Sequence, residues 1–344
     1  MRDDRTIAGS SKGSSTGADR LARPRRIGIT HDIMKLIAPL LLLLAVAAPL
    51  ALAQTPPSSS LAATQPARVL IVSIDGLRPD MALRAKSPNL HHLMETGSFS
   101  LWARTTALSI TLPSHVSMLT GVTPRKHEIE WNRDLPLTEP IYPSYPSLFE
   151  VAKRGGYTTA MAAGKSKFVT LARPGSVDWS YTPSSAKSED DDVVRHAVEI
   201  IRNHEPQVMF VHLPSTDNVG HAKGWGTPEQ LAAIEKADEC LGQILAALEE
   251  AKLRESTFII VSADHGGAGR THGPDDPRSR TIPWIAVGPG VRKNLDLTTY
   301  AALNINTEDT FATACHILKL PLDKRLDGKP ITEIFAVTEL LQPK

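Results

Sequence analysis

Short, continuous apolar runs alternate along this chain with stretches whose apolar residues recur every three or four positions. Apolar runs without polar alternation are typical of strands that are buried on both faces of a parallel sheet. Five such runs predict five strands: Val69–Ile74, Thr158–Ala162, Val208–Leu213, Phe258–Ser262 and Ile282–Val287.

Helical periodicity lies between these runs. The clearest helix begins at Thr227 and continues to about Lys252, because Thr227-Pro228-Glu229-Gln230 combines a capping-box pattern with a proline at the first helical position. Further helices are expected at Pro88–Thr96, Ser147–Arg154, Val193–Asn203 and Thr307–Leu318.

This alternation of strands and helices predicts an α/β fold with a mostly parallel central sheet and helices on both faces. Ligands of such sheets bind beyond the carboxyl ends of the strands. Residues 121–144 lack clear periodicity and are expected to form a loop over that edge.

The first 66 residues follow neither pattern. Residues 1–33 are rich in Arg, Ser, Gly and Asp and are expected to be disordered, and Met34-Lys35 precede an apolar run that ends at Ala53 in a small-x-small sequence. These are the marks of a secretory signal peptide, with Met34 as an alternative true start. An uncleaved membrane anchor is the competing interpretation, because about 18 apolar residues can just span a bilayer. Residues 54–66 are interpreted as a Pro/Ser/Ala linker.

The composition of the chain limits the classes of binding partner that are expected. The 344 residues, 41% of them hydrophobic, suffice for one large α/β domain. Without residues 1–53 the chain has 30 Lys/Arg against 33 Asp/Glu and a net charge of −3. A slightly acidic, periplasmic or secreted protein has no general attraction for polyanions, so nucleic-acid binding is not expected. Membrane association is expected only if the apolar N-terminal segment stays attached. Cys240 and Cys315 lie in apolar helical patterns and are interpreted as buried free thiols, with a disulfide as the alternative.

Carboxylates and histidines directly follow three of the predicted strands. Asp75 comes after the first strand, and Asp264 and His265 come after the fourth. Asp217 and His221 follow the third strand four residues apart, which places both on one face if that turn is helical. Because the carboxyl ends of parallel strands meet at one edge, these side chains are expected to share a crevice.

Two further residues belong to the same hypothesis. Thr111 precedes Pro113, which is expected to be the first helical residue, so Thr111 is either a helix cap or a nucleophile beside a helix N-terminus. A threonine hydroxyl is a weak nucleophile at its ordinary pKa, and metal coordination would lower that pKa. His272 lies in a loop of Gly, Arg and Thr, seven residues after His265, and is interpreted as a ligand.

This donor set is sufficient for two divalent metal ions. Mixed histidine and aspartate ligands favour Zn²⁺, with Mn²⁺ or iron as alternatives. Two ions about 4 Å apart would stabilise the attacking and leaving oxygens of an in-line displacement. One ion is assigned to Asp217, His221 and His272, and the other to Asp75, Thr111, Asp264 and His265.

Five segments carry a family resemblance: SIDGLRPD (Ser73–Asp80), TLPSHVSMLTG (Thr111–Gly121), HEIEWN (His127–Asn132), TDNVGHAKGWG (Thr216–Gly226) and SADHGG (Ser262–Gly267). In this combination and order they resemble the type I phosphodiesterase/nucleotide pyrophosphatase family of the alkaline phosphatase superfamily. The resemblance extends from Val69 to about Phe335.

The resemblance implies an alkaline-phosphatase-like three-layer sandwich, with residues 67–338 as a single phosphodiesterase catalytic domain. It implies the same division of metal ligands, with Thr111 as the nucleophile that attacks a small phosphoester such as a nucleotide or phosphodiester. It also implies that the amide of Asn132 donates to a phosphoryl oxygen, which is where a preorganised donor stabilises developing charge.

Some features depart from the better-known nucleotide pyrophosphatases. The final histidine ligand lies much farther downstream in those proteins than His272 does here. His316 is a rival that is interpreted as part of the core. Lys165 and Lys167 could reach a second phosphoryl group, but solvated side chains are the favoured interpretation.

The sequence favours cleavage of diesters or pyrophosphates, because no arginine occupies a motif position from which it would clamp a dianionic phosphate. Two alternatives stay open. One is a phosphomonoesterase with the same site, and the other is a non-catalytic metal-bound protein that binds a phosphorylated ligand.

Overall fold

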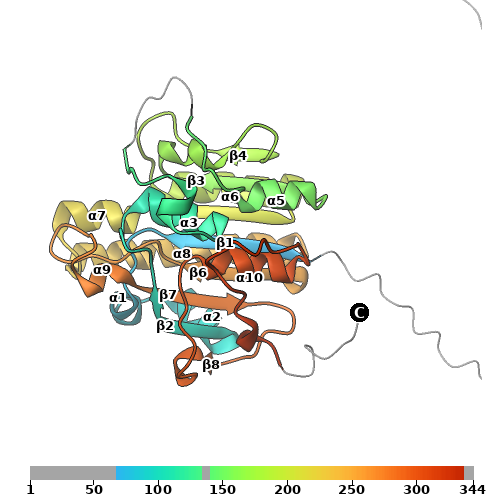
Figure 1. Ribbon diagram of the computed structural model, residues 1–344. Coiled ribbons are helices and arrows are strands. Elements are labelled where there is room, and N and C mark those ends of the chain that lie inside the picture. The colour runs from blue at the N-terminus through green and yellow to red at the C-terminus, as the bar shows by residue number, and fades with distance from the viewer. Residues whose placement is uncertain (1–66, 134–139, 337–344) are drawn as a thin grey trace, which may run out of the picture. The chain divides into compact units, whose positions relative to one another are not determined.

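A twisted eight-stranded sheet forms the middle layer of the protein (Figure 1). The computed structural model describes residues 67–133 and 140–336. The strands lie in the order β4-β3-β5-β1-β6-β7-β2-β8. Their bounds are β1 (Arg68–Ile74), β2 (Ser98–Arg104), β3 (Thr159–Ala163), β4 (Trp179–Tyr181), β5 (Val208–Leu213), β6 (Thr257–Ser262), β7 (Thr281–Val287) and β8 (Leu295–Asp296).

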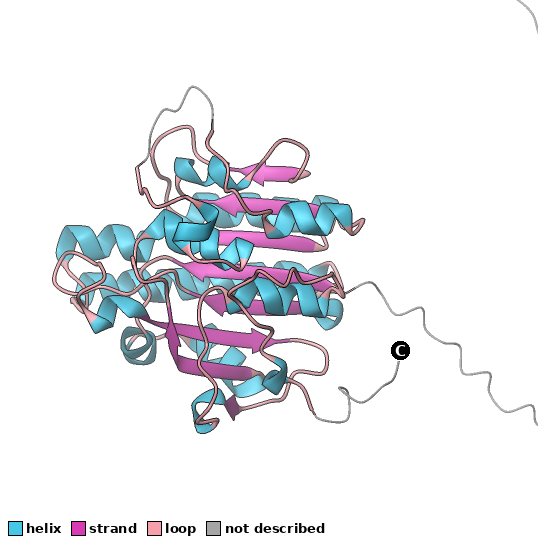
Figure 2. Ribbon diagram, in the orientation of Figure 1, coloured by secondary structure: helices cyan, strands magenta, loops and turns pink. Residues whose placement is uncertain are grey.

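Helices cover both faces of this sheet (Figure 2). Helices α3, α5 and α10 lie together on one face, and α2 and α6 pack against the long α8 on the other (Figure 1). The helix bounds are α1 (Pro79–Arg84), α2 (Pro88–Thr96), α3 (Thr111–Thr120), α4 (Pro124–His127), α5 (Leu148–Arg154), α6 (Asp190–His204), α7 (Ser215–Lys223), α8 (Pro228–Glu250), α9 (Pro277–Arg280) and α10 (Asp309–Ile317). Short 3₁₀ helices span Ser166–Leu171, Arg254–Ser256, Leu297–Thr299 and Thr332–Ile334.

The strand directions confirm the mostly parallel α/β sandwich. Strands β4, β3, β5, β1 and β6 are parallel neighbours, whereas β7 is antiparallel to both β6 and β2. Strands β1, β5 and β6 are buried almost along their whole length, as their continuous apolar sequences predict. Their carboxyl ends, and that of β3, therefore open at one edge.

The apolar runs located five of the eight strands, namely β1, β3, β5, β6 and β7, to within about one residue. Strand β2 was not predicted, because serines and Arg104 break its apolar pattern and its pairing with β7 shifts register between Ser100 and Ala103. The short strands β4 and β8 and the helices α1, α4 and α9 were also missed, and α4 lies within residues 121–144, which were expected to form a loop. Helix α3 begins at Thr111, so the expected start at Pro113 was wrong.

The ends of the chain and the two cysteines were also subjects of prediction. The predicted lead, signal peptide and linker lie outside the described residues, as does the end of the predicted 67–338 domain. Within the described ranges, no helix is both long and apolar enough to cross a membrane. Cys240 and Cys315 are buried free thiols, as interpreted from the sequence.

Candidate metal centre

The strand edge brings together two groups of metal-ligating side chains. We call Asp75, Asp264 and His265 the inner group, because all three are buried. We call Asp217, His221 and His272 the outer group, because its two histidines are partly exposed. Within each group the candidate ligand atoms all lie within 4.8 Å of one another.

The elements that carry these residues explain why they meet. Asp75 directly follows β1, and Asp264 and His265 follow its neighbour β6. Asp217 and His221 lie on α7, which begins two residues after β5 ends, so the four-residue spacing places them on one helical face. His272 reaches the edge from the loop between β6 and α9.

Thr111 lies beside the inner group. Its Oγ1 is 3.3 Å from Nε2 of His265, and it is the first residue of the ten-residue α3. The two groups adjoin, because the ring of His265 stacks on the ring of His272 with 3.7 Å between their centroids. The structure thus places the Thr111 hydroxyl beside His265, whose ring contacts His272 of the outer group.

All three histidines present the same nitrogen to the carboxylates. Nδ1 of His265 lies 2.8 Å from the carbonyl of Gly266, Nδ1 of His221 lies 3.0 Å from the carbonyl of Arg270, and Nδ1 of His272 lies 2.8 Å from the carbonyl of Ser109. A carbonyl oxygen only accepts, so each Nδ1 donates. In a neutral ring Nε2 is then a lone-pair acceptor.

The Nε2 atoms, which are acceptors in neutral rings, face carboxylate oxygens, which are acceptors as well. Nε2 of His265 is 3.1 Å from Asp264 Oδ2 and 3.4 Å from Asp75 Oδ1, and Nε2 of His221 is 3.3 Å from Asp217 Oδ1. Those three carboxylate oxygens are buried and have no hydrogen-bond partner. Buried acceptors without donors are costly unless a cation lies between them. The donor set therefore fits two divalent cations.

Burial keeps two of the histidines neutral. Burial, together with the neighbouring His272, lowers the pKa of His265 to about 3. Burial also lowers the pKa of His272. The Asp217 carboxylate, 3.3 Å from Nε2 of His221, raises the pKa of this more exposed histidine. His265, the histidine of the inner group, is consequently in the neutral imidazole form that a metal requires.

The second oxygen of each carboxylate is occupied by a protein donor. Nζ of Lys165 lies 2.6 Å from Asp75 Oδ2 and 2.7 Å from Asp217 Oδ2, and the backbone N–H of Gly76 donates to Asp264 Oδ1 over 3.1 Å. Burial alone would lower the pKa of Lys165, but the carboxylates of Asp217 and Asp75 outweigh it and raise the pKa. The interpretation of Lys165 as solvated was wrong, because 5% of it is exposed.

Asn132 is held against the start of α3. Its Oδ1 accepts from the backbone N–H of Leu112 over 3.0 Å and from Nζ of Lys167 over 3.1 Å. Because both donors take the oxygen, the amide nitrogen faces away from them and is left to donate elsewhere. Lys167 is buried as well, so it too is not a solvated lysine.

Two histidines that support the inner group were missed from the sequence. Nε2 of His212 lies 2.9 Å from Asp75 Oδ2, and Nδ1 of His115 donates to the carbonyl of Thr111 over 2.8 Å. His212 stands in the apolar run of β5, where no spacing pattern distinguishes it. His115 is in the TLPSH segment, but all ten residues of α3 are buried, so burial does not distinguish it from its neighbours. His316 is exposed on α10 and belongs to neither group, so its interpretation as core was wrong.

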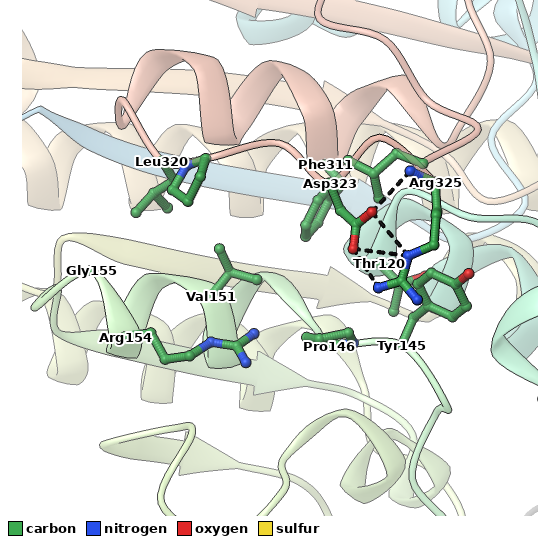
Figure 3. A pocket seen from close by; sticks show the side chains of 12 residues that line it. Thr120, Tyr145, Pro146, Val151, Arg154, Gly155, Phe311, Leu320, Asp323 and Arg325 are labelled. Carbon is green, nitrogen blue, oxygen red and sulfur yellow. Dashed lines mark hydrogen bonds and ion pairs between the residues drawn. The ribbon is translucent and has the colours of Figure 1, made fainter.

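The cavities lie around the groups rather than in them. A hollow of about 240 Å³ borders His272 and includes Thr271, Asp276 and Ser279. A cavity of about 400 Å³ lies between α5 and the end of α10, and its wall includes Val151, Arg154, Phe311 and Arg325 (Figure 3). Thr120 also lines it, at the opposite end of α3 from Thr111. The larger cavity is therefore about 14 Å along the helix axis from the threonine hydroxyl.

A three-layer α/β sandwich that gathers two groups of oxygen and nitrogen ligands beside a threonine defines a candidate metallohydrolase of the alkaline-phosphatase-like fold. The chain belongs to the type I phosphodiesterase / nucleotide pyrophosphatase family, whose sequence profile matches residues 69–273.

Known proteins show how far this similarity extends. An uncharacterised pyrophosphatase/phosphodiesterase of Schizosaccharomyces pombe is 27% identical over 217 residues, and human ectonucleotide pyrophosphatase/phosphodiesterase family member 5 is 26% identical over 214 residues. Each match covers 58% of this chain and 44% of the relative. An inactive form of murine ectonucleotide pyrophosphatase/phosphodiesterase 5 in complex with AMP has the same fold, with a TM-score of 0.65 at 17% identity over 78% of this chain and 100% of that one.

Proposed function

We propose that this protein is an exported, metal-dependent phosphoesterase that hydrolyses phosphodiester or pyrophosphate bonds with Thr111 as the nucleophile. The observation that carries the proposal is the position of the Thr111 hydroxyl, 3.3 Å from His265, at the junction of two groups whose buried oxygens have no partner. The activity named for its relatives supports the same reaction.

The proposed ligand sets are the two that the sequence suggests. Asp75, Thr111, Asp264 and His265 would hold one divalent ion, and Asp217, His221 and His272 would hold the other. Zinc suits this mixture of nitrogen and oxygen ligands, and manganese or iron would be accepted by the same donors. When bound, two such ions supply positive charge that activates the nucleophile and stabilises both reacting oxygens.

The protein's own residues then account for positioning. The Thr111 hydroxyl loses its proton to solvent as its oxygen attacks phosphorus in line, the bond from phosphorus to the leaving oxygen breaks, and the leaving oxygen takes a proton from water. Water attacks the resulting phospho-threonine, and cleavage of its P–O bond returns the Thr111 hydroxyl. The start of α3 would present its positive dipole end to a phosphoryl group bound beside Thr111, and the Asn132 amide nitrogen would donate to a phosphoryl oxygen.

The substrate class follows from the family and from one specific observation. The complex of the murine relative with AMP supports a nucleotide or a related small phosphoester as the substrate. A phosphomonoesterase is the second candidate, because the buried Lys167 brings a positive charge beside Asn132, at an edge where the sequence places no clamping arginine. Such charge would favour a dianionic phosphate.

A paired assay tests the proposal. The purified protein is expected to hydrolyse bis-p-nitrophenyl phosphate faster than p-nitrophenyl phosphate, and the Thr111→Ala variant is expected to lose turnover by at least about 10³-fold while its metal content stays intact. The reverse substrate preference would favour the monoesterase. Normal turnover in Thr111→Ala would show that Thr111 is not the nucleophile. Bound metal without turnover of any phosphoester would favour a non-catalytic binding protein.

A further inference from the structure

Lys165 touches one carboxylate of each group and has no role in the reaction described above. We propose that Lys165 is an internal counter-ion that keeps the metal centre folded before metal is bound and directs one carboxylate oxygen of each group toward its ion. The inference rests on the proposed metal centre. It makes Lys165 a positioning residue.

The backbone around Lys165 is fixed from both sides. The N–H of Gly164 donates to the carbonyl of His212, and the N–H of Ser166 donates to the carbonyl of Ala186 over 3.0 Å. Lys165 is also the cap of the 3₁₀ helix Ser166–Leu171. Because β3 lies directly beside β5, this anchored backbone delivers the ammonium group to the edge where Asp75 and Asp217 meet.

The charge balance shows what the ammonium group offsets. Asp75, Asp217 and Asp264 are three carboxylates that are at most 3% exposed. In the described part of the chain, the ion pairs that these carboxylates form with lysine or arginine all involve Lys165. A buried carboxylate without a partner is strongly unfavourable. Before metal binds, Lys165 is therefore the principal positive charge of the centre.

The same contacts settle which oxygens face the ions. Lys165 takes Oδ2 of Asp75 and Oδ2 of Asp217, and the unpartnered Oδ1 atoms are the ones that face His265 and His221. Without the ammonium group, Oδ2 of Asp217 would be released to bind or bridge the ions, whereas Oδ2 of Asp75 would keep His212 as a partner. Lys165, together with His212 at Asp75, thereby holds each carboxylate to one oxygen per ion, as partners behind metal ligands commonly do.

Lys165 and the metal ions offset the same negative charge, so they are thermodynamically linked. Removing the ammonium group destabilises the metal-free protein more than the loaded protein. By linkage, the variant gains more stability from metal and binds it more tightly than the wild type does. A residue that merely packed the core would lower the stability of both forms alike.

The test compares wild type with Lys165→Met by thermal unfolding of the full chain, after chelator treatment and again after zinc loading. Loss of one partner of a buried ion pair is expected to lower the metal-free midpoint by on the order of 10 °C. The zinc-induced rise should be larger than in wild type, and zinc titration should show tighter binding. In the Mn²⁺-loaded variant, the electron paramagnetic resonance spectrum of the two bound ions should change, because the released Oδ2 of Asp217 alters the ligation.

Lys167→Met is the matched control. It removes the same charge two residues along, where Nζ lies 3.1 Å from Oδ1 of Asn132. Its zinc-induced rise and its manganese spectrum should match those of wild type. Equal zinc-induced rises in wild type and Lys165→Met would overturn the proposal, and so would the same enlarged rise in Lys167→Met.

A double variant covers the case in which Lys165→Met does not fold without metal. Asp217→Asn should lower metal-free stability in the wild-type background, because it leaves Lys165 with one carboxylate fewer, and should raise stability in the Lys165→Met background. If Asp217→Asn changes metal-free stability in the same direction in both backgrounds, the proposal that Lys165 is the counter-ion is wrong. This measurement needs no turnover and no metal, so it stands even if the proposed phosphoesterase activity fails.

Discussion

The inner and outer groups use similar ligands but differ in what holds them. The inner group follows directly from the buried strands β1 and β6, and all of its side chains are shielded from solvent. The outer group is built from one turn of α7 and a loop, and the side chain of His221 is 46% exposed. One group is thus part of the sheet, whereas the other is attached at its rim.

The difference has an energetic meaning. Packed side chains on strand ends have lost their rotamer freedom during folding, so an ion that binds there meets ligands already in place. Exposed loop ligands lose freedom when the ion binds, and water reaches them. We therefore expect the inner ion to be held tightly and the outer ion to exchange.

The largest expected effect comes from the inner group. Asp264→Asn keeps an oxygen that can accept from the Gly76 N–H, so the fold should survive, but it removes the charge that faces His265. We expect a loss of kcat/KM on the order of 10³-fold or more and the loss of one ion per chain. Zinc content and activity on bis-p-nitrophenyl phosphate measure both. Recovery in excess zinc would contradict the inner group's rigidity.

His221→Ala should have a smaller effect that can be reversed. Its ring is half exposed and its loss removes one proposed ligand of the outer group, so metal affinity should fall by at least the roughly 10- to 100-fold that loss of a supporting residue costs, with little change in stability. Excess zinc should restore a large part of the activity. The pair of variants, measured in the same zinc series, shows whether the two groups differ as proposed.

Metal removal from the wild type should occur in two phases. A chelator should first remove the ion held by Asp217, His221 and His272, and more slowly the ion of the inner group. Metal content and activity followed over time would report the two steps. A single phase that releases both ions together would mean that the centre binds its ions as one unit.

The same contrast explains what the sequence could predict. The positions of Asp75 and Asp264 could be inferred because apolar strands end there and the ends of parallel strands share an edge. Asp217 and His221 needed one further assumption, a helical turn, and the structure contains it. These inferences used only local pattern and one general rule of topology.

Residues that act across the sheet left no such pattern. Lys165 follows β3, and its partners lie 90 and 52 positions away in the chain. A lysine is normally solvated, so the general rule pointed the wrong way. His212 has no spacing that separates a buried support of Asp75 from an ordinary residue of an apolar strand.

The smallest effect on activity is expected at Asp190, which anchors the helix that carries the outer group. Its Oδ1 accepts from the Ser215 N–H over 2.9 Å at the start of α7, and burial raises the pKa of Asp190 to about 7. The folded protein therefore keeps a proton that the unfolded chain releases near pH 4. This stabilising contribution is complete below about pH 4 and is lost as pH rises toward about 7.

Asp190→Asn should remove this loss of stability at high pH. The amide oxygen can still accept the hydrogen bond from the Ser215 N–H, and the amide does not ionise. The variant should be more stable than wild type at pH 8, by on the order of 1–2 kcal/mol, and the advantage should shrink as pH falls toward 4. Thermal midpoints between pH 4 and pH 8 at constant ionic strength measure the difference. Glu308, whose pKa burial also raises to about 7, is present in both proteins, so its contribution cancels in the comparison. If the difference in thermal midpoint between variant and wild type does not change with pH, Asp190 is ionised throughout this range and its contact with α7 does not depend on protonation.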